Sequence, residues 1–486
     1  MKWTPRPDQE PVLEFLMDRQ RAALFAATGA GKTALASSWA VDAMADRFAL
    51  PRLLIVAPKL VAQHGWPAEV HKWDHLAPLR DMRVLTSLDF GLSRVAPSVA
   101  TSVAGATSVA QVSEKPALGF RDKRATKLHL LGLRERVHVV AWDFWPWLVR
   151  ALGANWAYQG IIFDESSFLR DPSSARTSAA RHTVHRPGGV VDHVLLLSGT
   201  PAHNHGEALY PQIDLVAPGL LGRNLTAYRE TWCLPDASNW KTGQVYSWKT
   251  HPALQQKLNA LVATIAVSVP SSLTVPLIEV DQGVRLGDHA QAAYGAMERD
   301  WVWGGVAAGS EAVLHSKLRQ MASGFLYPGE DDRDPIWLHD AKTEKLVDLV
   351  ESIDGQVIVG FEFTEELRRI KGAFGKACRD IREPGALAAF KAGKIKVLAV
   401  HPQSAAHGVD GLQDVCCQVI WTTVPQDAEL AVQLVGRVHR HGTKAATVYA
   451  HYIVALGTVE ERIRQQSVPA KLAQADAFLA GIKLAA

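Results

Sequence analysis

Ala22-Ala23-Leu24-Phe25-Ala26-Ala27-Thr28-Gly29-Ala30-Gly31-Lys32-Thr33 is the most informative stretch of this sequence. Its apolar first half predicts a buried strand, and the helix-forming residues 34–45 follow directly. Glycines between a strand and a helix let backbone N–H groups turn toward phosphate oxygens, and the helix start adds its positive dipole end. This layout predicts a phosphate-binding loop, in which Lys32 contacts the β- and γ-phosphates of a nucleotide and the Thr33 hydroxyl binds Mg²⁺.

Two adjacent acidic residues, Asp164 and Glu165, follow the apolar stretch 160–163. Ligands of open α/β sheets bind at the carboxyl ends of the strands, which is where both carboxylates are expected to lie. We expect Asp164 to hold Mg²⁺ and Glu165 to polarise the attacking water. Further apolar runs predict strands of the same sheet at residues 53–57, 137–140 and 194–197.

The alternation of helices and strands restarts in the second half of the chain. Strands are predicted at residues 356–360, 395–400 and 419–421, and helices at 343–352 and 364–374. A Gly-punctuated loop at 404–413 precedes a predicted helix over 427–440, which carries Gln433, Arg437 and Arg440. These three residues are spaced i,i+4 and i,i+3, so they share one helix face. We interpret this face as one that reads phosphate, in preference to a solvated stripe.

Composition sets the limits within which these motifs act. The chain has 486 residues, 48% of them hydrophobic, and a formal net charge of +3. It can therefore build full cores, and any nucleic-acid contact must come from local patches because there is no global basic field. The four cysteines show neither a disulfide framework nor zinc-ligand spacing. The N-terminus has no signal-peptide core and no apolar run reaches about 18 residues, so we expect a cytoplasmic protein.

Three further features are weaker signals, and we expect each of them to have an ordinary structural role. The basic cluster at residues 121–124 with Lys127 is expected to be a solvated face more than a nucleic-acid contact. Trp142, Trp145 and Trp147 are expected to pack beneath the next helix more than to stack on bases. Residues 95–118, rich in Ala, Ser, Val and Gly, are expected to be a surface insertion of unassigned role.

Taken in order, the motifs resemble those of the superfamily-two helicases. The resemblance is strongest to the Swi/Snf-like branch, notably its compact phage-encoded DEAD-like members, and it covers nearly the whole chain. The matching segments are Arg6-x-x-Gln9, 28–33, 55–58, 163–166, 197–204, 401–413, 433–440 and 457–461. One departure is Ser166-Ser167, which stands where many relatives have a histidine, so a histidine link between the two domains is expected to be missing.

The resemblance implies an α/β protein of two tandem RecA-like domains, 1–268 and 269–486, each a parallel sheet flanked by helices. ATP and Mg²⁺ would lie in the cleft between them. The implied catalytic residues are Lys32, Asp164, Glu165, Gln433, Arg437 and Arg440, with Thr33 and Asp164 at the metal. The implied nucleotide-binding residues are Arg6, Gln9, Thr28, Gly29, Ala30, Gly31, Lys32, Thr33, Gly408 and Asp410. Ser198 and Thr200 would couple the domains.

The function implied is an ATP-dependent DNA helicase or translocase. Its substrate would be duplex or branched DNA, in phage-type replication, recombination or repair in the cytoplasm of a bacterial host. Two alternatives stay open. One is a nucleic-acid-stimulated remodelling ATPase that never separates strands, and the other is an RNA helicase.

Overall fold

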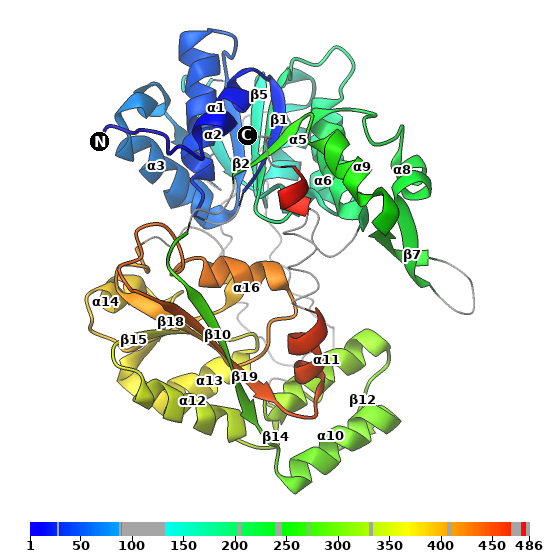
Figure 1. Ribbon diagram of the computed structural model, residues 1–486, viewed down its shortest axis with the longest axis vertical. Coiled ribbons are helices and arrows are strands. Elements are labelled where there is room, and N and C mark those ends of the chain that lie inside the picture. The colour runs from blue at the N-terminus through cyan, green and yellow to red at the C-terminus, as the bar shows by residue number, and fades with distance from the viewer. Residues whose placement is uncertain are drawn as a thin grey trace, which may run out of the picture.

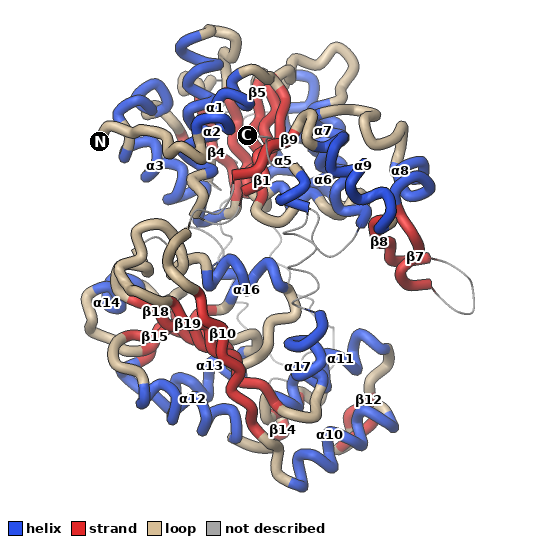
Figure 2. The backbone as a smooth tube through the Cα atoms, in the orientation of Figure 1, coloured by secondary structure: helices blue, strands red, loops and turns tan. Residues whose placement is uncertain are grey.

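Two lobes, each built on its own parallel β-sheet, make up the computed structural model of this chain (Figure 1). The structure describes residues 1–26, 29–86, 89, 132–201, 206–238, 245–269, 273–329, 334–405, 411–467 and 478–482. Helices flank both sheets (Figure 2). This arrangement confirms the expected α/β class with two tandem RecA-like domains.

The first lobe is organised around a seven-stranded sheet in the order β3-β4-β2-β5-β6-β1-β9, in which every neighbouring pair is parallel. β6 lies between β1 and β5, with Phe25 opposite Ser198 and Asp164 opposite Leu197. Parallel strands in register end at one edge of the sheet, so the loop after β1 and the acidic pair at the end of β5 meet there. The strands are β1 Arg21–Ala26, β2 Leu53–Ala57, β3 Arg83–Val84, β4 Val137–Ala141, β5 Gly160–Asp164, β6 His193–Ser198 and β9 Ala266–Val269.

Helices cover both faces of this sheet, and each face has its own apolar core. Trp142 and Trp145 are buried, and Trp142 stacks on Phe163 of β5 with ring centroids 5.7 Å apart. The expected packing of these two tryptophans is therefore confirmed, whereas the residues of the basic cluster and 95–118 lie outside the described part of the chain. The helices are α1 Glu10–Met17, α2 Lys32–Val41, α3 Trp66–Lys72, α5 Trp145–Leu152, α6 Ala175–Val184, α7 Tyr210–Val216, α8 Leu225–Trp232 and α9 Gln255–Val262.

An antiparallel hairpin extends from the first lobe, with β7 Cys233–Ser238 paired to β8 Val245–Thr250 (Figure 2). The sequence analysis did not predict this hairpin, although β8 contains the strand-forming residue types Val, Tyr, Trp and Thr. Gly206 lies against this hairpin, because a Cβ there would come within 2.4 Å of the Thr250 backbone nitrogen.

The second lobe contains a six-stranded sheet in the order β10-β19-β18-β15-β17-β16, again with parallel pairs throughout. β15 and α13 have the bounds that the apolar periodicity predicts. Two short antiparallel pairs, β11–β12 and β13–β14, accompany the sheet. The strands are β10 Leu277–Val284, β11 Val302–Trp303, β12 Val306–Ala307, β13 Phe325–Leu326, β14 Ile336–Trp337, β15 Gln356–Gly360, β16 Cys378–Asp380, β17 Val397–Val400, β18 Cys416–Trp421 and β19 Val448–Ala455. The helices are α10 Asp288–Asp300, α11 Glu311–Ala322, α12 Ala341–Ser352, α13 Thr364–Phe374, α14 Ala386–Lys391, α15 Pro402–Ala405, α16 Ala428–Val435 and α17 Val459–Arg462.

The last described residues return to the first lobe (red in Figure 1). Phe478 and Ile482 are buried in the same core cluster as Trp145, and the Ser268 hydroxyl donates to the Leu479 carbonyl at 3.0 Å. None of the helices within the described residues has the length and apolar character that a bilayer-spanning helix requires.

A buried ion pair joins α12 to α17 in the second lobe. Lys342 Nζ donates to Glu460 Oε1 at 2.6 Å and to the Thr422 carbonyl at 2.7 Å, and Glu460 is fully buried. Glu460 also accepts the backbone N–H groups of Val424 and Ala455. The two backbone groups supply hydrogen bonds, and Lys342 supplies the positive charge that balances the buried carboxylate.

We expect Lys342→Met to lower the free energy of unfolding by about 3–5 kcal/mol, because it leaves a buried carboxylate without its cation. Chemical denaturation followed by tryptophan fluorescence measures this change. Lys345→Met, on the same helix but partly exposed, is the control and should cost well under half as much. Adding Glu460→Gln to Lys342→Met should recover part of the loss, since the amide keeps an acceptor oxygen without the charge. Equal midpoints for Lys342→Met and Lys345→Met would contradict the assignment.

Candidate active site

The loop after β1 has the backbone that phosphate binding requires. Gly29 and Gly31 have φ angles of 83° and 88°, a left-handed region that favours glycine. A Cβ on Gly31 would lie 2.5 Å from Gln9 Nε2, so a side chain there would displace the Gln9 amide from the loop. α2 begins at Lys32, as the sequence predicts, and Lys32 Nζ donates to the Ala26 carbonyl at 2.6 Å. Its ammonium group thus lies back over the loop.

Arg6 and Gln9 brace this loop from beneath. Both donate to the Ala30 carbonyl, Arg6 Nη2 at 3.1 Å and Gln9 Nε2 at 2.8 Å. The Gln9 Oε1 atom accepts the Arg6 backbone N–H at 3.0 Å. The two residues therefore fix the loop backbone, and they also line the pocket described below. Thr28 lies outside the described residues.

Two tryptophans hold Asp164 at the end of β5. Trp66 Nε1 donates to Asp164 Oδ2 at 2.9 Å, and Trp142 Nε1 donates to the Asp164 carbonyl at the same distance. Burial, reinforced by the neighbouring charge of Glu165, raises the pKa of Asp164 to about 6. The sequence did not identify Trp66 as a positioning residue, because a single tryptophan on a helix is typical of an apolar core.

Glu165 has a left-handed backbone, with φ of 58°, which is uncommon for a residue with a side chain. Two serine hydroxyls reach its Oε1 atom, Ser167 at 3.1 Å and Ser198 at 3.2 Å. Ser198 also accepts the Thr200 backbone N–H at 3.1 Å, and both Ser198 and Thr200 are buried. The left-handed turn therefore carries a carboxylate that two hydroxyl groups hydrogen-bond and that lines the pocket described below.

α16 and the turns after it contribute the residues of the second lobe that line this site. The helix is shorter than the sequence predicts. The expectation of one helix over 427–440 is wrong, because α16 ends at Val435 and turns follow. Gly436 weakens helix continuation, and His439 Nε2 hydrogen-bonds the Val275 carbonyl at 2.7 Å, which draws the chain out of the helix. Gln433, Arg437 and Arg440 therefore do not share one helix face, although all three line the same pocket.

The two lobes meet over the phosphate loop. A Cβ on Gly29 would lie 3.0 Å from the Arg440 Cβ atom, so the second lobe packs directly on the loop. α16 lies on the side of the second lobe that faces the first (Figure 1). Burial lowers the pKa of Lys32, Glu165 and Asp164 oppose that shift, and Arg437 adds to it. Arg437 is therefore close enough to Lys32 for their charges to interact.

A pocket of about 440 Å³ lies between the lobes at this point. Its volume falls within the usual range of small-molecule sites, roughly 300–1,000 Å³. The predicted site residues that line it are Arg6, Gln9, Gly29, Gly31, Lys32, Thr33, Asp164, Glu165, Gln433, Arg437 and Arg440. Ala30, which belongs to the loop, is buried, and Gly408 and Asp410 lie outside the described residues.

One wall of the pocket was not predicted from the sequence. Trp3, Glu69, Lys72 and Trp73 contribute to it, and the Trp73 indole donates to Glu69 Oε1 at 2.7 Å. The Lys72 ammonium lies 4.6 Å from the centre of a Trp73 ring. These residues carry no motif, so only the fold brings them to the site.

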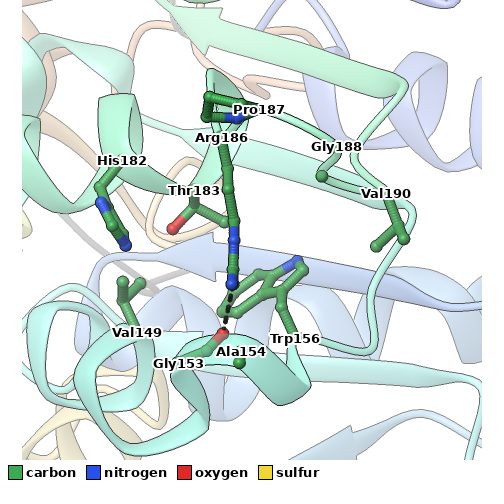
Figure 3. Close-up of a pocket in the computed structure, with 11 residues that line it drawn as sticks. Val149, Gly153, Ala154, Trp156, His182, Thr183, Arg186, Pro187, Gly188 and Val190 are labelled. Carbon is green, nitrogen blue, oxygen red and sulfur yellow. Dashed lines mark hydrogen bonds between the residues drawn. The ribbon is translucent and has the colours of Figure 1, made fainter.

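A second, smaller cavity of about 160 Å³ lies on the first lobe (Figure 3). Trp156, His182 and Arg186 line it, and Arg186 Nη1 donates to the Gly153 carbonyl at 2.8 Å. None of the predicted site residues contributes to this cavity.

The residues at the interlobe pocket fit a magnesium–phosphate complex. Within the described residues there is no cluster of three or more His, Cys, Asp or Glu side chains that could hold a metal ion by itself. Mg²⁺ is usually bound by one or two carboxylates together with substrate phosphates and water. Thr33 and Asp164 both line the pocket and supply such oxygen ligands.

Sequence reasoning also missed Glu429, which lies on α16 four residues before Gln433. Its side chain is buried and reaches residues of the first lobe. The only signal in the sequence was its i,i+4 spacing to Gln433, whose Nε2 donates to Glu429 Oε1 at 3.3 Å.

The sequence of this chain is similar to those of two kinds of known protein. No protein-family model matches the chain. The chain is 27% identical over 482 residues to a protein designated p41 of Acyrthosiphon pisum secondary endosymbiont phage 1, a match that covers 96% of this chain and 95% of that protein. It is 25% identical over 348 residues to SWI/SNF-related matrix-associated actin-dependent regulator of chromatin subfamily A-like protein 1 of Xenopus tropicalis. That match covers 67% of this chain and 34% of the relative, so it spans about a third of the relative's length.

Among solved structures, the Sulfolobus solfataricus SWI2/SNF2 ATPase core in complex with dsDNA aligns with a TM-score of 0.41 and 16% identity. The alignment covers 99% of this chain and 94% of that one. The sequence similarity to the SWI/SNF-related protein confirms the expected resemblance of this chain to Swi/Snf-like proteins.

Proposed function

We propose that this chain is an ATP- and Mg²⁺-dependent DNA translocase of the helicase type. The observation that carries the proposal is the interlobe pocket, where Lys32 of the first lobe and Arg437 and Arg440 of the second line one cavity with Asp164 and Glu165. Phosphate recognition by a glycine loop, a lysine and two arginines suits a triphosphate. Because both lobes supply parts of the site, the state of the nucleotide can control how the lobes sit together.

In this proposal each side chain has a defined task. Lys32 and the loop N–H groups bind the β- and γ-phosphates, and Gln433, Arg437 and Arg440 stabilise the charge that develops on the γ-phosphoryl group. Glu165 orients the attacking water and accepts its proton. Mg²⁺, held by Thr33 and Asp164, would neutralise charge on the phosphate oxygens when bound.

We further propose that residues 1–268 and 269–486 are the two moving units. The sheet of the first lobe ends with β9 and that of the second begins with β10, which supports a division near residue 269. Residues 478–482 are an exception to this division, because they pack in the core of the first lobe and would move with the first unit. Hydrolysis would then shift two nucleic-acid grips relative to each other, with Ser198 and Thr200 in the coupling path.

DNA is the preferred partner in this proposal, and the similarity to a phage protein over 96% of the chain supports a phage-type role in the bacterial cytoplasm. With a net charge of only +3, DNA affinity must come from local patches and should fall with salt. A remodelling ATPase without strand separation and an RNA helicase remain the rival functions.

Measuring ATP hydrolysis with single-stranded DNA, duplex DNA, forked DNA and RNA tests the proposal. We expect duplex or forked DNA to raise kcat at least tenfold over the unstimulated rate, and RNA to raise it less. A larger stimulation by RNA would favour the RNA helicase. Displacement of a triplex strand without duplex unwinding would identify a translocase that does not separate strands. Hydrolysis that no nucleic acid stimulates would overturn the proposal.

A further inference from the structure

Glu429, a buried carboxylate of the second lobe, shares a hydrogen-bond partner with Glu165, the proposed catalytic carboxylate of the first lobe. Glu429 of α16 is only 5% exposed. The Ser167 hydroxyl lies 2.9 Å from Glu429 Oε1, and Arg170 Nη1 lies 3.3 Å from Glu429 Oε2. Ser167 belongs to the Ser166-Ser167 pair, which stands where many relatives have a histidine that links the two domains. The structure shows that a serine and a glutamate make a link at this place.

Ser167 cannot serve both of its partners at once. Its hydroxyl lies 3.1 Å from Glu165 Oε1 and 2.9 Å from Glu429 Oε1, yet a hydroxyl carries a single proton to donate. Ser198 donates to the same Glu165 oxygen at 3.2 Å. When Ser167 points to Glu165, two donors occupy that oxygen; when it points to Glu429, one donor remains.

The position of the second lobe determines which arrangement is available. Glu429 comes from α16, so it competes for the Ser167 proton only while the lobes are docked as they are here. A catalytic base must have a lone pair directed at the proton that it accepts. Drawing one donor away from Glu165 Oε1 frees such a lone pair.

We propose that Glu429 is a positioning residue that couples lobe docking to the catalytic carboxylate, by withdrawing the Ser167 hydroxyl from Glu165 and leaving that oxygen open to the attacking water. This inference rests on the proposed ATP hydrolysis and deepens it. Ser167 is the relay between the lobes, and Arg170 holds the outer oxygen of Glu429. With the lobes apart, Ser167 returns to Glu165 and hydrolysis is slow.

The surroundings of Glu429 give the coupling a pH dependence. The charged groups that act on Glu429 are Glu165, Arg170 and Lys32 from the first lobe and Asp427, the residue that caps the N-terminus of α16. Burial, then the charge of Glu165, raises the pKa of Glu429 to about 8, while Arg170 opposes the rise. The ionised form accepts from Ser167 and the protonated form donates to it. The share of molecules with an open Glu165 therefore grows as pH rises through about 8.

The test is a double-mutant cycle of Glu429→Ala and Ser167→Ala in the full chain, with DNA-stimulated kcat and KM measured from pH 6.5 to 9. We expect Glu429→Ala to lower kcat about tenfold with KM for ATP changed less than about twofold, since one hydrogen bond to a charged group is removed. In the Ser167→Ala background the same change should alter kcat less than about twofold, because the relay is already absent. The rise of kcat with pH should be present in the wild type and lost in both single variants.

Glu429→Gln keeps the shape and a weaker acceptor, so an intermediate kcat is expected. This second variant keeps the test decisive if Glu429→Ala does not fold. Glu344→Gln, an exposed glutamate on α12, is the matched control and should leave kcat unchanged. A wild-type protein without nucleic-acid-stimulated hydrolysis would overturn the proposed function and this inference with it. An active wild type in which Glu429→Ala keeps full kcat, or loses as much in the Ser167→Ala background, would overturn this inference alone.

Discussion

Replacing Arg437 with alanine is expected to lower kcat for DNA-stimulated ATP hydrolysis by about 10³–10⁵-fold, the loss seen when an arginine that stabilises phosphoryl transfer is removed. Arg437 lies in the interlobe pocket, and its charge acts on Lys32 across the cleft. Its contribution belongs to the transition state, where charge spreads over the γ-phosphoryl oxygens. ATP binding should therefore weaken far less than turnover does.

The measurement compares single-turnover hydrolysis with binding of a fluorescent ATP analogue. Arg437→Lys should recover only part of the rate, because an ammonium cannot reproduce the planar fork of the guanidinium. Arg379→Ala, an exposed residue on β16 of the same lobe, is the control and should behave like wild type. If Arg437→Ala kept more than about a tenth of wild-type kcat, the cleft between the lobes would not be the catalytic centre.

Glu165→Gln is the second large effect, with an expected loss of kcat of about 10²–10⁴-fold, the range of general acid–base catalysis. Glutamine preserves the side-chain shape but cannot take up the proton of the attacking water. Lys32→Ala should also abolish hydrolysis, but for a different reason, because it removes the cation that contacts the nucleotide phosphates. Lys32→Ala should weaken ATP-analogue binding, whereas Glu165→Gln should retain it.

Thermal unfolding separates these losses from misfolding. Both variants should melt close to wild type, because each side chain lines the pocket and neither belongs to the apolar cores of the first lobe. Glu14→Gln, an exposed glutamate on α1, is the matched control for charge removal. Normal turnover in either Glu165→Gln or Lys32→Ala would reject the assignment of this site.

The parts of the fold that local chemistry encodes were predictable. The phosphate loop follows from two glycines between an apolar strand and a helix, and the structure gives both glycines the left-handed backbone that the motif requires. β15 and α13 match their predicted bounds because apolar periodicity and turn residues act over a few neighbouring positions. The acidic pair at the end of β5 was predictable for the same reason, because the end of a strand is a local feature.

The sequence by itself determined two parallel α/β units, the loop at Gly29–Thr33, the acidic pair at Asp164 and Glu165, and the residues Gln433, Arg437 and Arg440. Only the tertiary structure decided that Trp66 holds Asp164, that α16 stops at Val435, and that the Ser167 hydroxyl lies between two carboxylates. Ser167 and Glu429 are 262 positions apart in the chain. A contact at that separation arises from how two lobes dock, and docking depends on shape and charge gathered from many distant segments, which no local pattern of residues records.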